Sequence, residues 1–166
     1  MRIGREKMIV QLTPAEMFLA TTVGASRQWQ NLDAGRKDKY GFNADPWAMH
    51  IESSRSECAL AKALNVFWSG NLGDMKAADV GRFQVRLRVL DLDAPGVRTS
   101  LILHPQDKDE DTFFLIWGRR GKYKIVGFLK AVEGKISKYW SDPAGGRPAF
   151  FVPIDVMHPF EEWHNR

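Results

Sequence analysis

The sequence contains a single cysteine, Cys58, among 166 residues. One cysteine excludes an intramolecular disulfide and a zinc site built from cysteines, and it favours a reduced, cytoplasmic setting. No apolar run approaches the roughly 18–20 residues that span a bilayer, so we expect no membrane segment. Residues 1–11 hold only the short apolar run Met8–Val10, and we expect no signal peptide there.

Charge of one sign is not in large excess either. The chain has 24 Lys and Arg against 20 Asp and Glu, a net charge of +4 at pH 7. This balance permits nucleic acid as a partner without requiring it. Apolar residues make up 44% and charged residues 27%, which rules out wholesale disorder. The length favours one domain over residues 1–166, with a helical part at about 13–69 and a sheet part at about 79–153.

Two helix starts can be found in the first half of the chain. Thr13 and Glu16 form a capping-box pattern around Pro14, and this helix is expected to run to about Trp29. Asp45-Pro46 repeats the cap-plus-proline signal, and a second helix is expected to run to about Phe67.

Strand patterns dominate after residue 70. Strict alternation predicts a strand, and a Gly-Arg-Arg-Gly turn predicts a hairpin. The expected strands are Phe83–Leu90, Ser100–His104, Thr112–Trp117, Tyr123–Ala131 and Ala149–Val152, and a short helix is expected within 154–166. Two helices followed by a mostly antiparallel or mixed sheet indicate an α+β fold.

Glu57 lies on the apolar stripe of the second predicted helix, in line with Leu60, Ala61 and Leu64. A carboxylate there is costly to bury unless it is paired, hydrogen-bonded or bound to metal. One interpretation places Glu57 at the rim of the stripe, where its carboxylate reaches water or pairs with an arginine. The other makes it a functional acid.

The strand that starts at Phe83 carries Gln84, Arg86 and Arg88 on one face. Asp79 precedes it. Such a face is also typical of a half-exposed strand with a solvated polar side. Two residues of separation nevertheless bring an amide oxygen and a cation to the same face, where both could meet one phosphate.

Together, Ser56-Glu57-Cys58-Ala59, Asp79 and Gln84-Val85-Arg86 resemble the PD-(D/E)XK restriction-endonuclease-like nuclease superfamily. The resemblance implies a restriction-endonuclease-like core and metal-dependent phosphodiester hydrolysis of DNA. It implies that Glu57, Asp79 and Gln84 hold Mg²⁺ or Mn²⁺, with the Val85 carbonyl as an extra ligand, and that Arg86 clamps the scissile phosphate. Because Gln84 is uncharged, we expect weak metal binding.

The chain from about Thr13 to Pro153 also resembles small uncharacterised bacteriophage proteins. The resemblance is carried by Asp-Val-Gly-x-x-Gln-Val-Arg at 79–86, by the acidic loop 107–111 and by residues 147–153. It implies a phage origin and a location in the cytoplasm of the bacterial host.

Five basic residues are candidates for contacts with a nucleic-acid backbone. They are Arg82, Arg88, Arg119, Arg120 and Lys122. If the hairpin tip follows a phosphate backbone, binding should weaken steeply with salt. The nuclease resemblance makes DNA the expected nucleic acid. The alternative function is a catalytically inactive nuclease-fold module that binds nucleic acid or a host or phage protein.

Overall fold

The computed structural model describes residues 8–36, 45–73, 77–94 and 99–165. Residues 1–7 of the N-terminal stretch, on which we based the expectation about a signal peptide, lie outside these ranges. No helix within the described ranges is long and apolar enough to cross a membrane.

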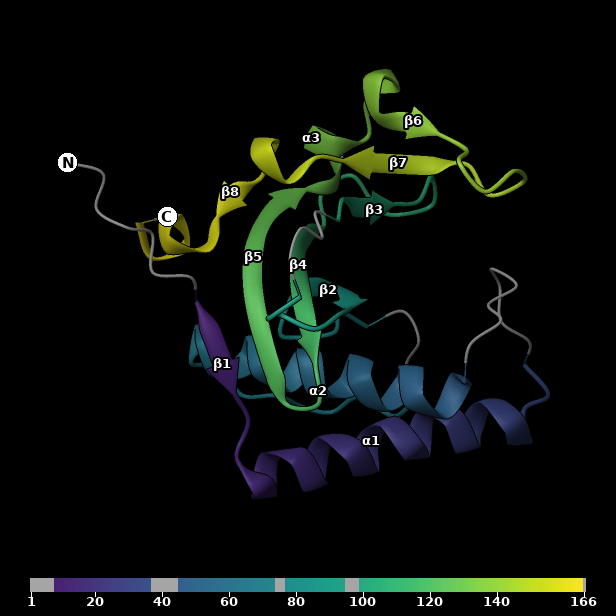
Figure 1. Cartoon of the computed structure of the whole chain (residues 1–166). Coiled ribbons are helices and arrows are strands. Elements are labelled where there is room, and N and C mark those ends of the chain that lie inside the picture. Colours follow the sequence, from purple (N-terminus) through teal and green to yellow (C-terminus); the bar gives the residue numbers. More distant parts are fainter. Residues whose placement is uncertain (1–7, 37–44, 74–76, 95–98, 166) are drawn as a thin grey trace.

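The two predicted helices are present and lie side by side (Figure 1). Helix α1 spans Pro14–Asp33, and Thr13 caps it through the predicted capping box with Glu16. Helix α2 spans Pro46–Leu64 and is capped by the side chain of Asp45. Helix α1 is one turn longer than predicted. Helix α2 ends earlier than predicted, because Asn65 takes a left-handed conformation (φ 54°) that stops it.

The main sheet has the order β1-β5-β4-β2, and β8 pairs with β5. Strands β4 and β5 form the predicted antiparallel hairpin, whereas β2 pairs with β4 in parallel and forms an edge of the sheet. The bounds are β1 Ile9–Gln11, β2 Phe83–Val89, β4 Thr112–Arg119, β5 Lys122–Lys130 and β8 His158–Pro159. The sheet is therefore mixed, and the sequence patterns did not predict β1 or β8.

A second, smaller sheet has the order β3-β7-β6 and is antiparallel. Its strands are β3 Leu101–Leu103, β6 Trp140–Ser141 and β7 Ala149–Val152. The helix α3, Ala131–Gly134, follows β5 directly, and short 3₁₀ turns occupy 137–139, 154–156 and 160–165. The short helix expected near the C-terminus is thus of the 3₁₀ type.

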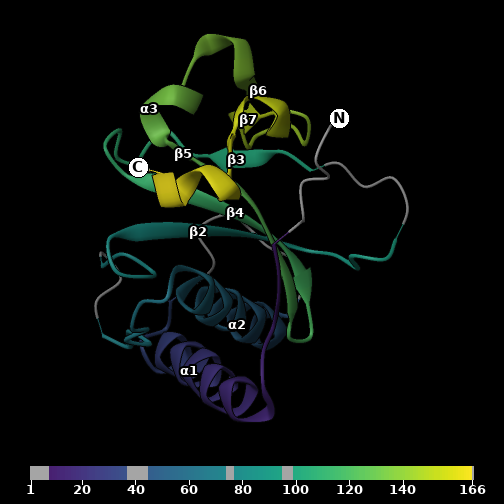
Figure 2. The ribbon, with the colours of Figure 1, turned by 90° about the vertical axis from the view of Figure 1, so that its left-hand side faces the viewer.

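Three layers result, with the helices below the main sheet and the small sheet above it (Figure 2). Each face of the main sheet has its own core. The core on the helix side combines Leu60 of α2 with Phe114 and Ile116 of β4. The core on the other side combines Phe113 of β4 with Leu103 of the small sheet. The predicted α+β class, with two N-terminal helices followed by a mixed sheet, is confirmed.

Gly24 marks the closest approach of α1 to α2. A Cβ atom on Gly24 would lie 2.5 Å from the Cα of Ile51 and 2.6 Å from the carbonyl oxygen of His50. Because backbone atoms cannot move aside as a side chain can, Gly24→Ala should force the helices apart. We expect a loss of about 1–3 kcal/mol, beyond the roughly 1 kcal/mol that alanine gains in helix propensity.

Urea unfolding followed by circular dichroism measures this loss. Gly73→Ala is the matched control, because a Cβ there meets nothing within 4 Å and Gly73 has no positive φ. An equal unfolding midpoint for Gly24→Ala and wild type would show that the two helices are not closely packed at this point.

Candidate functional site

Glu57 is buried between the two long helices, with 4% of its surface exposed. Arg27 of α1 forms a bidentate ion pair with it: Nη1 donates to Oε1 at 2.7 Å and Nη2 to Oε2 at 3.0 Å. The indole of Trp68 donates to Oε2 at 3.3 Å. The expected pairing of Glu57 with an arginine is therefore confirmed. The expected place at the rim of the stripe is wrong, because the residue is buried.

Asp79 lies close enough to Glu57 for the two charges to interact. Burial raises the pKa of Glu57 to about 7, and the neighbouring Asp79 acts in the same direction against the opposing effect of Arg27. Burial also raises the pKa of Asp79, although the N–H of Val85, Arg86 and Arg27 act to lower it. Two like charges lie close together in a buried place, so ionising both acids is unfavourable.

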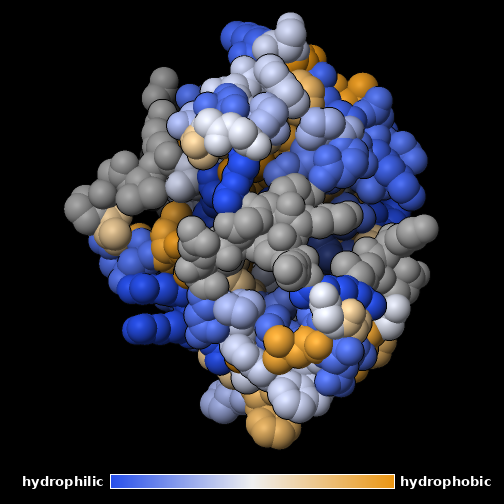
Figure 3. Space-filling model, turned by 90° about the vertical axis from the view of Figure 1, so that its right-hand side faces the viewer, coloured by the Kyte–Doolittle hydropathy of each residue, from blue (hydrophilic) through white to orange (hydrophobic). Residues whose placement is uncertain are grey.

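A cleft of about 420 Å³ opens beside this cluster, between α1, the start of α2 and the segment that leads to β2. Arg27 and Asp79 line the cleft together with Asn31, His50 and Asn71, whereas Glu57 stands behind Arg27. Figure 3 shows the side of the molecule opposite the N-terminus of Figure 1, where hydrophilic residues predominate. Both signs of charge reach the cleft, through Arg27 and Asp79.

Gln84 and Arg86 lie on the other face of the main sheet from Glu57. The neighbouring residue Val85 packs into the core on the helix side, so the side chains of Gln84 and Arg86 face the small sheet. Gln84 Nε2 is 3.5 Å from Asp111 Oδ2. Arg86 binds both carboxylate oxygens of Asp107 at 2.9 Å. The predicted convergence of Glu57, Asp79 and Gln84 is therefore wrong, although Asp79 lies near enough to Glu57 to affect its pKa.

Arg86 is fixed by two further contacts on the small-sheet side. Its guanidinium lies 4.5 Å above the ring of Phe113, and its Nε donates to the carbonyl of Ile102 at 3.3 Å. The partner Asp107 also accepts from the N–H of His104 at 2.7 Å. Arg86 thus joins β2 to the small sheet, a structural role that its strand parity alone did not predict.

The residues present do not fit the implied three-ligand magnesium site. Hard cations need several oxygens arranged around one point. Here the two oxygens of Glu57 accept from Arg27, one oxygen of Asp79 accepts from the N–H of Val85 at 2.7 Å, and Gln84 is on the opposite face. Within the described ranges there is also no group of three or more His, Cys, Asp or Glu suited to a metal ion.

The nucleic-acid candidates have a different arrangement. Parallel pairing sets Arg88 of β2 beside Trp117 of β4, and antiparallel pairing sets Lys124 of β5 on the other side of Trp117. Two residues further along the hairpin, Arg119 pairs with Lys122. By strand parity all five side chains belong to the small-sheet face. We call this set, Arg88, Trp117, Arg119, Lys122 and Lys124, the cationic end of the sheet.

Glu52 of α2 anchors the hairpin turn next to the cationic end. It accepts from the backbone N–H of Arg120 at 3.0 Å and from the hydroxyl of Tyr123, and Arg55 donates to it at 3.0 Å. Arg120 takes a left-handed conformation (φ 54°), which the tight turn requires. The turn is therefore fixed to α2 by a partly buried network of hydrogen bonds.

Arg82 is the exception among the five candidates. It precedes β2, at the opposite end of that strand from Arg88, and its guanidinium lies 5.3 Å above the ring of Phe83. Arg27 and Glu52 were not among the residues predicted from the sequence. A partner for Glu57 had been expected, but nothing in the sequence pointed to Arg27, thirty positions earlier.

Comparisons with known proteins add no assignment. No protein-family model, no curated protein and no solved structure matches the chain.

The Glu57 cluster should make stability fall as the pH rises from about 4.5 to 7. The folded chain holds the Glu57 proton up to about pH 7, whereas the unfolded chain releases it near the ordinary value of 4.5. The folded state therefore binds more protons in this window and loses stability as they are removed. Glu57→Gln cannot titrate, so its stability should vary less with pH.

Urea unfolding of both proteins at pH 5, 6, 7 and 8 measures the two slopes. Glu16→Gln is the control: burial acts to raise the pKa of Glu16, but hydrogen bonds from Lys62 and Thr13 hold it below 4.5. Its contribution is present above pH 4.5 and is lost only at lower pH, so Glu16→Gln should keep the wild-type slope. Parallel curves for Glu57→Gln and wild type would contradict the raised pKa.

Proposed function

We propose that the protein is a non-hydrolytic module that binds the phosphate backbone of DNA through the cationic end of its sheet. The observation that carries the proposal is the gathering of four cations, Arg88, Arg119, Lys122 and Lys124, on one face at one end of a rigid sheet. A phosphate backbone is recognised by rows of such charges.

The acids near Arg119 and Lys122 do not neutralise these two cations firmly. Arg119 lies 3.3 Å from Asp91 and Lys122 lies 3.8 Å from Asp93, and the side chains of both cations are more than 40% exposed. Ion pairs of this kind contribute about 0–1 kcal/mol and are screened by salt. A phosphate can therefore replace the aspartates at little cost.

Trp117 adds an aromatic surface among the charges. The ammonium of Lys124 lies 5.2 Å from the centre of its ring. Cations combined with aromatic side chains are typical of proteins that bind single strands, in which bases stack while cations follow the backbone. Trp117 is largely buried, however, so we assign it no base-stacking role.

Hydrolysis is left out of the proposal because the acids lack the required arrangement. Arg27 holds Glu57, and Gln84 is on the opposite face from it. Incubation of plasmid and single-stranded DNA with Mg²⁺ or Mn²⁺ should leave both substrates intact. Cleavage that is lost in Asp79→Ala would instead establish a metal-dependent nuclease and remove the non-hydrolytic module.

The double variant Arg119→Gln, Lys122→Gln tests the binding surface. Each lost phosphate contact should lower the slope of log affinity against log salt by about one, so we expect a decrease of about two. The affinity for DNA at about 0.1 M salt should fall roughly tenfold or more. Fluorescence anisotropy of a labelled oligonucleotide, recorded over a salt series, measures both quantities.

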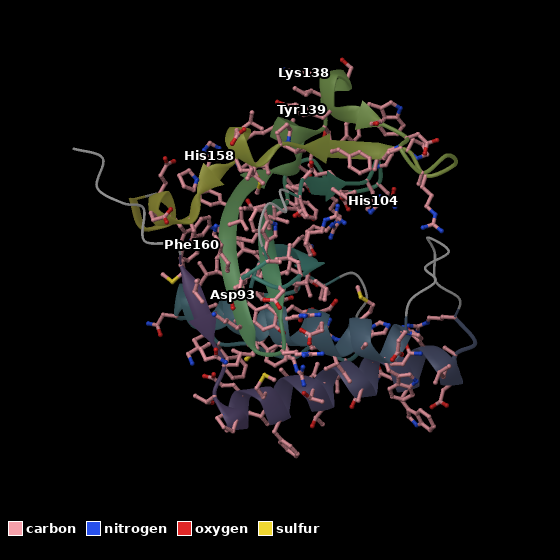
Figure 4. The ribbon with its side chains drawn as sticks, in the orientation of Figure 1. Asp93, His104, Lys138, Tyr139, His158 and Phe160 are labelled. Carbon is pink, nitrogen blue, oxygen red and sulfur yellow. The ribbon has the colours of Figure 1, made fainter. Side chains whose placement is uncertain are left out.

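The variant Lys108→Gln, Lys138→Gln carries the same change in net charge elsewhere. Both lysines are exposed, and Lys138 lies beyond the small sheet, far from α1 and α2 (Figure 4). This control should bind DNA as wild type does. Equal losses in the two double variants would show that only net charge matters, and unchanged binding in both would exclude the cationic end as the DNA-binding surface.

A further inference from the structure

Two hydrogen-bond donors at the cationic end are buried without acceptors. The indole nitrogen of Trp117 and the Nε of Arg88 are both shut off from solvent, and neither has a hydrogen-bond partner in the described part of the chain. Trp117 as a whole is only 9% exposed. Buried donors are nearly always paired in folded proteins, so two unpaired donors in one place call for an explanation.

The two donors belong to neighbouring side chains. Arg88 and Trp117 are register partners across β2 and β4, and their side chains stand on the same face. Arg88 forms no ion pair within the described ranges, unlike Arg86, the next cation on the same face. Burial lowers the pKa of Arg88, yet an arginine keeps its charge. The position therefore combines an uncompensated cation with a neutral N–H donor.

A water molecule would satisfy the indole N–H but would leave the positive charge without a counter-ion. An oxyanion satisfies both needs, because its oxygens accept from two donors and its charge offsets that of the guanidinium. Charge-assisted bonds of this type are stronger than neutral ones, especially where solvent is excluded. The ammonium of Lys124, 5.2 Å from the centre of the Trp117 ring, adds a second positive charge nearby.

We propose that Arg88 and the indole N–H of Trp117 form a binding site for a single phosphate group. This inference rests on the proposed function, because the backbone of DNA would supply the phosphate group. It adds to that function the position at which one phosphate binds. One phosphate would be held in a fixed position here, while the exposed Arg119 and Lys122 follow its neighbours along the strand.

Nuclear magnetic resonance of the indole N–H groups tests the site directly. The Trp117 signal is identified by its absence in Trp117→Phe, which removes the donor and keeps an aromatic ring. In the wild-type protein this signal should move and saturate on titration with inorganic phosphate, and separately with a short oligonucleotide. Sodium chloride at equal ionic strength should not move it.

Arg88→Lys keeps the charge but loses the planar fork of donors, and it should weaken the phosphate-dependent shift about tenfold in affinity. Arg82→Lys is the matched control, because Arg82 is at the other end of the same strand, and it should behave as wild type does. If both substitutions weaken the response equally, the site is not at Arg88. The test uses the wild-type signal first, so a poorly folded variant does not decide the result.

The two titrations separate the phosphate site from DNA binding. A Trp117 shift with both ligands supports the site and its role in DNA binding. A shift with phosphate alone, without affinity for DNA, supports the anion site and overturns the proposed function. If the protein binds DNA but the Trp117 signal does not move, the phosphate site is overturned and the proposed function stands. If the Trp117 signal moves with neither ligand and the protein also has no affinity for DNA, both the site and the proposed function are overturned.

Discussion

The in-register parallel pairing of β2 with β4 is the constraint on which the rest of the arrangement depends. Phe83 pairs with Thr112, and the pairing continues to Val89 and Gly118. Because side chains alternate along a strand, this register sends Val85 to the helix side and Arg88 to the side of Trp117. A slip of one residue would bury the arginines against α2 and leave the apolar set facing the small sheet. Two apolar cores, one on each face, prevent such a slip.

Charge is distributed over the two faces in different ways. On the helix side the charged groups are buried and interact with one another. Arg27 forms an ion pair with Glu57 and also interacts electrostatically with Asp79. On the small-sheet side, the strength with which the cations are paired decreases toward the hairpin turn. Arg86 is tied to Asp107, whereas Arg119 and Lys122, nearer the hairpin turn, have exposed and weakly held ion-pair partners. Buried pairs hold elements together, whereas weakly paired cations can exchange their partners for a ligand. The two faces are therefore suited to different tasks.

Local signals in the sequence predicted the elements well. The Thr13 capping box and Pro46 gave both helix starts, and the glycines around Arg119 and Arg120 gave the hairpin. The short strands β1 and β8 were missed because each has only two or three residues, too few for a period to show. Their existence depends on β5, far along the chain, and not on their own pattern.

The site could be predicted only in part, for a related reason. The stripe position of Glu57 correctly indicated that a carboxylate is buried on α2, and alternation correctly placed Gln84 and Arg86 on a common face. Which face of the sheet α2 would cover is decided by tertiary packing, and strand parity carries no information about it. The nuclease-like pattern joined residues that share spacing along the chain, but Gln84 and Glu57 lie on opposite faces of the folded sheet.

Rigidity is the property that the cationic end gains from its surroundings. Glu52 holds the backbone of Arg120 and the hydroxyl of Tyr123, so the turn is fixed to α2 before any ligand arrives. Arg88 and Trp117 are fixed by the pairing of their strands. A surface whose cations are already placed pays less conformational entropy on binding than one that must order its loops. The partly buried network around Glu52 lies behind the proposed binding surface, yet it keeps the charged side chains of the hairpin in position to meet a phosphate backbone.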